Sequence, residues 1–307
     1  MSAVAGAPER PVQAGLPRLR PRSVTRRRGV NLAITIGAWL AGAVGIFMMG
    51  WIVTTVVARG IGAWNWAFFT QLPPVGTETS GGLANCIVGT IVITLGAMAM
   101  GLPLGFLGAI YLSEFGRAGR VATFIRAITN LVLGVPSIIA GLFAYGLIVA
   151  RVHHYSGFAA SFALAFIMLP VMTRTAEDIL NLVPNELRES ALAMGAPRWR
   201  VTLGVIVKAA RGGLITGTIL AVVRVAGETA PLLFTALSSP YWMHGLFGPD
   251  GYFGGPVGNL TKQIYDFSGQ PYPHLVQLAW GGSLLIIVFV LGANILTRLL
   301  FQRGKEW

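Results

Sequence analysis

Charged residues are scarce in this chain: they make up 11% of its 307 residues, whereas hydrophobic residues make up 54%. Soluble globular proteins devote roughly a quarter of their residues to charge. The scarcity excludes an ordinary soluble domain and predicts an integral membrane protein. The net charge of +12 does not indicate a nucleic acid as partner, because most of the basic residues flank apolar segments.

Cysteine and histidine are also rare. Cys86 is the only cysteine, which excludes a disulfide framework and a thiolate metal cluster. The histidines fall in connecting segments or at the edges of apolar stretches, without a carboxylate at ligand spacing, so we expect no metal site. They are His153, His154, His244 and His274.

Lysine occurs only at Lys208, Lys262 and Lys305. A phosphate-binding loop requires the pattern Gly-x-x-x-x-Gly-Lys-Ser/Thr, and none of the three lysines stands in that setting. We therefore expect no nucleotide or other cofactor on this chain and no enzymatic activity of its own. Any process that needs energy would have to draw it from a partner.

Long apolar runs are abundant by contrast. Crossing about 30 Å of hydrocarbon takes about 20 helical residues, and six stretches meet this length or approach it. The prediction is an all-α, polytopic membrane protein with six transmembrane helices within residues 30–307, the fourth being the shortest. The stretches are 31–57, 83–112, 122–149, 158–173, 213–236 and 275–299.

The basic residues are distributed unevenly between the two sides. Of the 23, 19 lie in the two terminal segments and in the second and fourth connections, and the alternate connections hold only three. Because lysine and arginine concentrate on the cytoplasmic side, both termini are expected to be cytoplasmic in a multi-pass protein of the cell (inner or plasma) membrane. Residues 1–29, rich in proline and arginine, are expected to form a disordered arm that can lie against anionic lipid.

The fourth connection, at about 174–211, contains a polar helical pattern. Asn185 is expected to cap its first turn and Gly195 to end it. Leu187, Ala191 and Met194 follow at i, i+4 and i+7, which predicts one apolar stripe. Such a helix is suited either to a groove in another protein or to the membrane surface, and the pattern leaves both open.

Glu189-Ser190-Ala191, three further residues and then Gly195 resemble the EAA loop of permease subunits in ATP-binding-cassette (ABC) importers. The resemblance implies that these four residues couple the chain to one of two ATPase subunits, where ATP and magnesium bind. Two departures from the family pattern are present. Ser190 replaces the usual alanine, and Lys208 and Arg211 stand where relatives commonly have prolines.

The fifth apolar stretch carries two charges, Arg224 and Glu228, one helical turn apart. Its ten Leu, Ile, Val and Phe residues favour insertion by roughly 3 to 6 kcal/mol, whereas the two charges cost roughly 5 to 7. They are therefore expected to face the protein interior or a water-filled path. Pro231 leaves the Gly227 carbonyl without its helical donor. The pair can line an anion path or form a structural ion pair at a kink.

RVAGETAPLLFTA, at 224–236, resembles the span-five signature of the A-type permease subunit of phosphate importers, and WNWAFFTQLPP and QIYDF resemble further segments. The resemblance implies the type I importer permease (MetI-like) fold. It also implies a heterodimer with a second permease subunit and an extracytoplasmic phosphate-binding protein, which the outside loop at about 237–274 is expected to contact. The implied substrate path contains Arg224, Gly227, Glu228 and Thr229.

Three alternatives remain open at this point. The chain can serve an importer of another oxyanion, such as sulfate, molybdate or phosphonate. It can be a secondary carrier driven by protons through Glu228, although the EAA pattern argues against this. It can also be a non-transporting membrane scaffold for phosphate sensing, in which the charged pair is structural.

Overall fold

The computed structural model describes residues 22–76, 78–116 and 119–301. Within these residues every element of regular secondary structure is a helix, as expected for an all-α membrane protein. Most of the expected basic arm lies outside the described residues. The chain divides into two units, Met1–Thr54 and Thr55–Trp307, and each is described by itself.

The first unit contains most of helix α1 (Arg22–Gly60). The first candidate span, Arg27–Ala63, covers most of this helix and continues past its end, so it is longer than the predicted 31–57. Large apolar side chains such as Trp39 and Ile46 are exposed on it. A helix that is apolar all round is typical of a membrane span.

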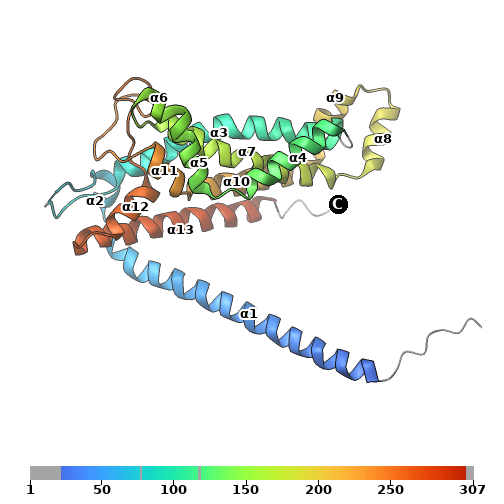
Figure 1. Ribbon diagram of the computed structural model, residues 1–307, viewed down its shortest axis with the longest axis horizontal. Coiled ribbons are helices and arrows are strands. Elements are labelled where there is room, and N and C mark those ends of the chain that lie inside the picture. The colour runs from blue at the N-terminus through green and yellow to red at the C-terminus, as the bar shows by residue number, and fades with distance from the viewer. Residues whose placement is uncertain (1–21, 77, 117–118, 302–307) are drawn as a thin grey trace, which may run out of the picture. The chain divides into compact units, whose positions relative to one another are not determined.

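The second unit contains the remaining helices (Figure 1). The segments η2, η3 and η4 are π-helical turns continuous with their neighbours. In chain order the elements are η1 (Ile61–Ala63), α2 (Trp66–Thr70), α3 (Ala84–Ile110), η2 (Tyr111–Phe115), α4 (Arg120–Leu133), α5 (Ser137–Ala144), η3 (Tyr145–Val149), α6 (Ala150–Val152), α7 (Gly157–Asn181), α8 (Asn185–Ala193), α9 (Arg198–Val201), η4 (Thr202–Ile206), α10 (Val207–Ala226), α11 (Ala230–Thr235), α12 (Leu260–Ser268) and α13 (Pro273–Phe301).

Five of the described helices are long and apolar enough to cross a membrane, and a sixth span results if one bent pair counts as a single span. The bent pair is Arg120–Leu133 followed by Ser137–Val152, with 103° between the two helices. Pro136 explains the bend, because it lacks an N–H and disfavours helical backbone at the residue before it. The six-span prediction is confirmed with its third span sharply broken.

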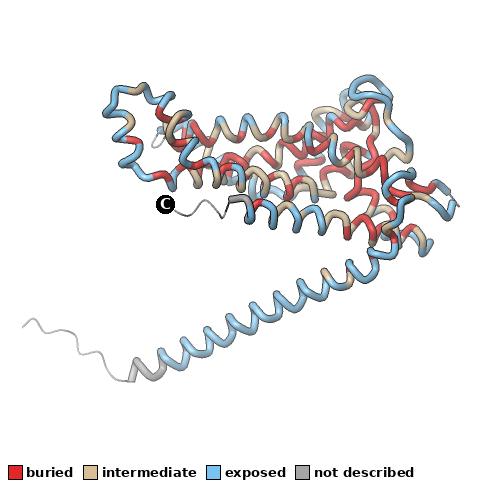
Figure 2. Tube along the Cα trace, turned by 180° about the vertical axis from the view of Figure 1, so that it is seen from behind, coloured by how far each residue is buried: buried red, intermediate tan, exposed pale blue. Residues whose placement is uncertain are grey.

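Helix α7 lies at the centre of the second unit and is the most buried candidate span (Figures 1 and 2). It runs through Asn181, so the fourth span is longer than the predicted 158–173. Gly101 of α3 lies against Ala165 and Met168 of α7, and Gly217 of α10 lies against Thr175. These small residues allow close contact between the helices.

The predicted fifth span at 213–236 is wrong in its boundaries. The structure has a span at Arg198–Ala226, a break at 227–229 and then the short helix α11. Pro231 lies in the first turn of α11, where its missing N–H costs nothing, so a new helix begins instead of a kink within one helix. Because α7 extends to Asn181, the non-spanning part of the fourth connection is shorter than 174–211.

The loop at about 237–274 is largely irregular but contains α12, which the sequence pattern did not predict. Asn259 caps α12 by accepting the Lys262 N–H at 3.0 Å. At the other end of the loop, Asn85 Nδ2 of α3 donates to the carbonyl oxygens of Ser239 at 2.8 Å and Tyr241 at 3.2 Å. The Asn85 contacts hold the first part of the loop against α3.

Candidate functional site

The break at 227–229 places the two intramembrane charges in different backbone settings. Arg224 lies in the last turn of α10 and is exposed, whereas Glu228 lies in the break and is half-buried. The Glu228 N–H donates to the Val225 carbonyl at 3.1 Å. The Glu228 carbonyl accepts from Thr261 Oγ1 of α12, also at 3.1 Å. The break is therefore a fixed, hydrogen-bonded feature.

Arg224 and Glu228 line one cleft of about 130 Å³. This volume is far above the roughly 15 Å³ that one water needs. The other walls come from the α4–α5 bend and from α7, and they contribute Val132, Leu133, Val135, Ser137, Ala140, Phe166, Ile167, Pro170 and Val171. Arg224 and Glu228 are the charged members of this lining, so the cleft combines apolar walls with one fixed cation and one carboxylate.

No ion pair joins Arg224 to Glu228 in the described part of the chain. The alternative in which a salt bridge between them locks the break is therefore not what the structure contains. The break is held by backbone contacts and by Thr261. Arg224 lines the cleft, where the planar donors of its guanidinium can bind an oxyanion through two hydrogen bonds.

Ser137 is a member of the cleft that the sequence analysis missed. It is the first residue of α5, directly after Pro136, and it lines the same cleft as Arg224. Its signal in the sequence was a proline followed by a hydroxyl residue inside an apolar run, which is a pattern for a new helix start. The N-terminal end of a helix carries a partial positive charge that favours anions.

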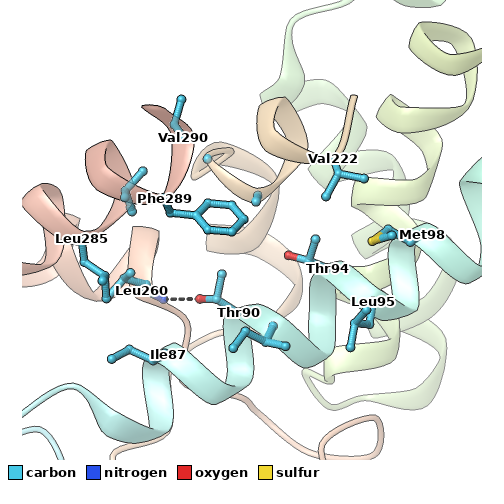
Figure 3. Close-up of a pocket in the computed structure, with 14 residues that line it drawn as sticks. Ile87, Thr90, Thr94, Leu95, Met98, Val222, Leu260, Leu285, Phe289 and Val290 are labelled. Atoms are coloured by element: carbon cyan, nitrogen blue, oxygen red, sulfur yellow. Dashed lines mark hydrogen bonds between the residues drawn. The ribbon is translucent and has the colours of Figure 1, made fainter. Parts of the chain in front are cut away.

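Gly227 and Thr229 do not line this cleft. Gly227 instead borders a larger cavity of about 300 Å³, whose lining is almost entirely apolar (Figure 3). Thr90 and Thr94 are its hydroxyl residues, and Thr90 Oγ1 accepts the Leu260 N–H at 2.8 Å. An apolar cavity does not suit an anion, so only Arg224 and Glu228 of the four predicted path residues come together.

The wall of the charged cleft depends on a close approach between α5 and α11. A Cβ at Gly141 would lie 2.6 Å from Pro231 Cα. Changing Gly141→Ala is therefore expected to push α5 from α11 and to cost about 1 to 3 kcal/mol of stability. The thermal unfolding midpoint of the variant measures this cost and should be lower than that of the wild type. The function that depends on the cleft should be reduced as well.

Gly146 supplies the matched control in the same helical segment, because a Cβ there meets nothing within 4 Å. Gly146→Ala is expected to unfold at the wild-type temperature. Equal midpoints for the Gly141 and Gly146 variants would contradict the packing argument.

The second set of predicted site residues surrounds α8. This helix begins at Asn185 after Pro184, so Asn185 is not the cap that the sequence predicted, and its Oδ1 accepts instead from Arg188 Nη1 at 3.3 Å. The chain turns after the helix at Gly195, where φ is +77°. A left-handed residue at this position favours glycine, and the predicted helix end is confirmed.

The predicted apolar stripe is wrong in part. Ala191 packs against a buried cluster that includes Val183 and Ile206, whereas Met194 is 87% exposed because it lies beyond the last residue of the helix. Leu182, just before α8, is 81% exposed. The outer surface of this segment therefore presents apolar side chains from both ends of α8.

Three of the EAA-like residues lie on α8 and the fourth, Gly195, lies just after it. Glu189 is exposed and lines a cavity of about 290 Å³ together with Glu114, Arg188 and Arg198. Ser190 Oγ donates to the Glu186 carbonyl at 2.7 Å. Ala191 is half-buried and Gly195 forms the turn. Among the described residues, no group of three or more His, Cys, Asp or Glu side chains could hold a metal ion.

Residues 101–305 match the family described as binding-protein-dependent transport system inner membrane component. The chain is 40% identical over 287 residues to a phosphate transport system permease protein PstA of Yersinia pestis, covering 94% of this chain and 95% of the relative. It is 42% identical over 277 residues to PstA of Pasteurella multocida, covering 90% and 95%.

The fold is similar to that of a solved chain of the MetNI methionine ABC transporter in inward-facing conformations. The TM-score is 0.56 at 18% identity, over 73% of this chain and 95% of that one. At this identity the likeness concerns the fold alone. It agrees with the type I importer permease fold expected from the sequence.

Proposed function

The chain belongs to the family of binding-protein-dependent transport system inner membrane components and, within it, to the PstA phosphate permeases, and from this we propose how it transports its substrate. It is the membrane-spanning permease subunit of a phosphate ABC importer. Inorganic phosphate crosses the membrane along the cleft that Arg224 and Glu228 line. The single observation that carries this path is the unpaired setting of Arg224 at a broken helix beside that cleft.

Three features of the cleft support phosphate as its occupant. The Arg224 guanidinium offers planar donors that match phosphate oxygens. Ser137 and the N-terminal end of α5 add a hydroxyl and a favourable dipole to the lining of the same cleft. Glu228 offsets part of the positive charge, which keeps binding weak enough for release, as conduction through a path requires.

We propose that the chain acts together with partner subunits that supply the functions it does not have itself. A second permease subunit completes a heterodimer, and two ATPase subunits bind ATP and magnesium at the cytoplasmic face. Glu189, Ser190, Ala191 and Gly195 shape the segment that contacts one ATPase subunit, and the exposed Leu182 and Met194 support this role. Closure of the ATPase dimer shifts α8 and opens the path outward, and hydrolysis resets it.

The orientation follows from the same proposal. The cytoplasmic side holds both termini and α8, and the outside loop at about 237–274 faces an extracytoplasmic phosphate-binding protein. The hydrogen bond from Thr261 to the Glu228 carbonyl connects this loop directly to the break in the path. Docking on the outside loop can therefore alter the cleft.

Uptake of radiolabelled phosphate by proteoliposomes tests this function. The vesicles would contain the chain with its second permease and ATPase subunits, with ATP inside and the phosphate-binding protein outside. We expect uptake that requires ATP, persists with a proton uncoupler, and is not reduced by a hundredfold excess of sulfate or molybdate.

The same measurement separates the alternatives. Loss of uptake with an uncoupler at constant ATP would favour a proton-driven carrier that uses Glu228. Competition by sulfate or molybdate would point to an importer of another oxyanion. ATP hydrolysis with no uptake of any of these anions would favour a non-transporting scaffold.

A further inference from the structure

A buried arginine ties α8 to the membrane-spanning helices. The Arg188 residue is only 7% exposed although it lies on a short polar helix. Its Nη2 donates to the Leu180 carbonyl at 2.7 Å and pairs with Glu114 Oε1 at 3.0 Å. Its Nη1 donates to the Val183 carbonyl. One guanidinium therefore joins α8 to the end of α7 and to η2.

A second arginine, Arg126, joins α4 to α7 and to η2 by similar contacts. Arg126 Nε of α4 pairs with Glu177 Oε1 of α7 at 2.7 Å, and the Glu177 side chain is only 4% exposed. Arg126 Nη2 donates to the Leu112 carbonyl at 2.9 Å. Leu112 and Glu114 both belong to the π-helical turn η2, so the two arginines meet at the same turn and at the same end of α7.

Helix α4 then leads from this junction to the cleft. Arg126 lies seven positions before Leu133, about 10 Å along a helix axis, and Leu133 lines the cleft with Arg224. Because a helix moves as a rigid element, a displacement of α4 at Arg126 is delivered to the cleft wall at Val132 and Leu133. The contacts thus run without interruption from α8 to the path.

Stability alone does not account for one buried and one partly buried ion pair at the same junction. The desolvation of buried charges offsets most of their attraction, and apolar replacements are often as stable. What a forked guanidinium adds is a fixed geometry between three elements at once. Single-turn π-helical insertions such as η2 also occur frequently at functional sites.

We propose that Arg188 and Arg126 are positioning residues that transmit movement of α8, through η2 and the end of α7, to the α4 wall of the phosphate cleft. This inference rests on the proposed function, in which α8 contacts the ATPase and the cleft carries phosphate. It assigns the coupling to two named ion pairs, Arg188 with Glu114 and Arg126 with Glu177.

The test uses the full complex in proteoliposomes and measures how far the phosphate-loaded binding protein stimulates ATP hydrolysis. Glu177→Gln keeps the shape of the side chain and removes the charge that holds Arg126. Coupling between distant sites is typically about 5- to 150-fold, and we expect the stimulation ratio to fall about tenfold. A purely structural role would lower the amount of assembled complex but leave the ratio of the assembled fraction unchanged.

Asp178→Asn is the matched control, because it makes the same chemical change at the next residue, where the side chain is 57% exposed and pairs with Arg174. Its stimulation ratio should equal that of the wild type. An equal fall in both variants, or a wild-type ratio for Glu177→Gln, would overturn the proposal.

Arg126→Lys keeps the inference testable if Glu177→Gln fails to assemble. Lysine retains a partner for Glu177, but its single ammonium lacks the fork that also reaches the Leu112 carbonyl. The stimulation ratio is expected to fall with assembly preserved, and an unchanged ratio would overturn the proposal. Because this readout does not require phosphate to pass Arg224, it can fail or succeed independently of the proposed path.

Discussion

Phosphate uptake is expected to fall at least about 100-fold when Arg224 is changed to Gln, while the complex still assembles and hydrolyses ATP. A unit charge about 5 Å from the anion contributes about 3 kcal/mol at an effective dielectric constant of 20. Each 1.4 kcal/mol corresponds to about a factor of ten. Glutamine removes this attraction and leaves Glu228 as the charged residue of the cleft, which then repels the substrate.

The same experiment also tests whether Glu228 repels the substrate once Arg224 is gone. Removing the repelling carboxylate as well, in the double variant Arg224→Gln with Glu228→Gln, should restore part of the uptake that the single variant loses. Arg224→Lys keeps the charge without the planar fork and should lie between the wild type and Arg224→Gln.

Arg211→Gln is the matched control on the same helix. Arg211 is exposed and lies 13 positions before Arg224, about 20 Å along the axis, and it borders a different, largely apolar cavity. Its uptake should match that of the wild type. Uptake at the wild-type rate in Arg224→Gln, measured in the same vesicles, would exclude Arg224 from the path.

The sequence predicts the number and class of the spans because apolar length alone decides them. It places the ends of the fourth and fifth spans less well. Helix α7 continues past residue 173 through Arg174, Glu177 and Asp178, since the buried Glu177 pairs with Arg126. That partner is 51 residues away, and no local pattern reveals it. The break before Pro231 was predicted as a kink within one helix, because a proline is compatible both with a kink and with the start of a new helix.

The candidate site was likewise predictable only in part. The cost of two charges in an apolar run requires that Arg224 and Glu228 avoid lipid, and the structure places both at one cleft. The composition of the other walls depends on how the α4–α5 bend folds against α7 and α11, which brings Ser137 to the cleft from far along the chain. The sequence pattern did not single out Arg188, because its burial depends on Glu114, 74 positions earlier.

Charge reversal at Glu189 is the second change with a large expected effect. Glu189 is exposed on α8 and shares a cavity with Arg188 and Arg198. Glu189→Lys would place a third cation there and present a positive charge where the ATPase is proposed to bind. Disrupting a charge at a protein interface costs about 2 to 5 kcal/mol when the group is buried by the partner, so co-purification of the ATPase should fall at least about tenfold.

Asp178→Lys makes the same charge reversal at an exposed position of α7, outside α8, and should leave the ATPase bound. If Glu189→Lys also kept it bound, the coupling role of Glu189 would be excluded. Glu189→Lys can then be compared directly with Glu177→Gln. Loss of the ATPase in Glu189→Lys, with a retained but poorly stimulated ATPase in Glu177→Gln, would separate the surface that binds the ATPase from the buried contacts that carry its movement to the cleft.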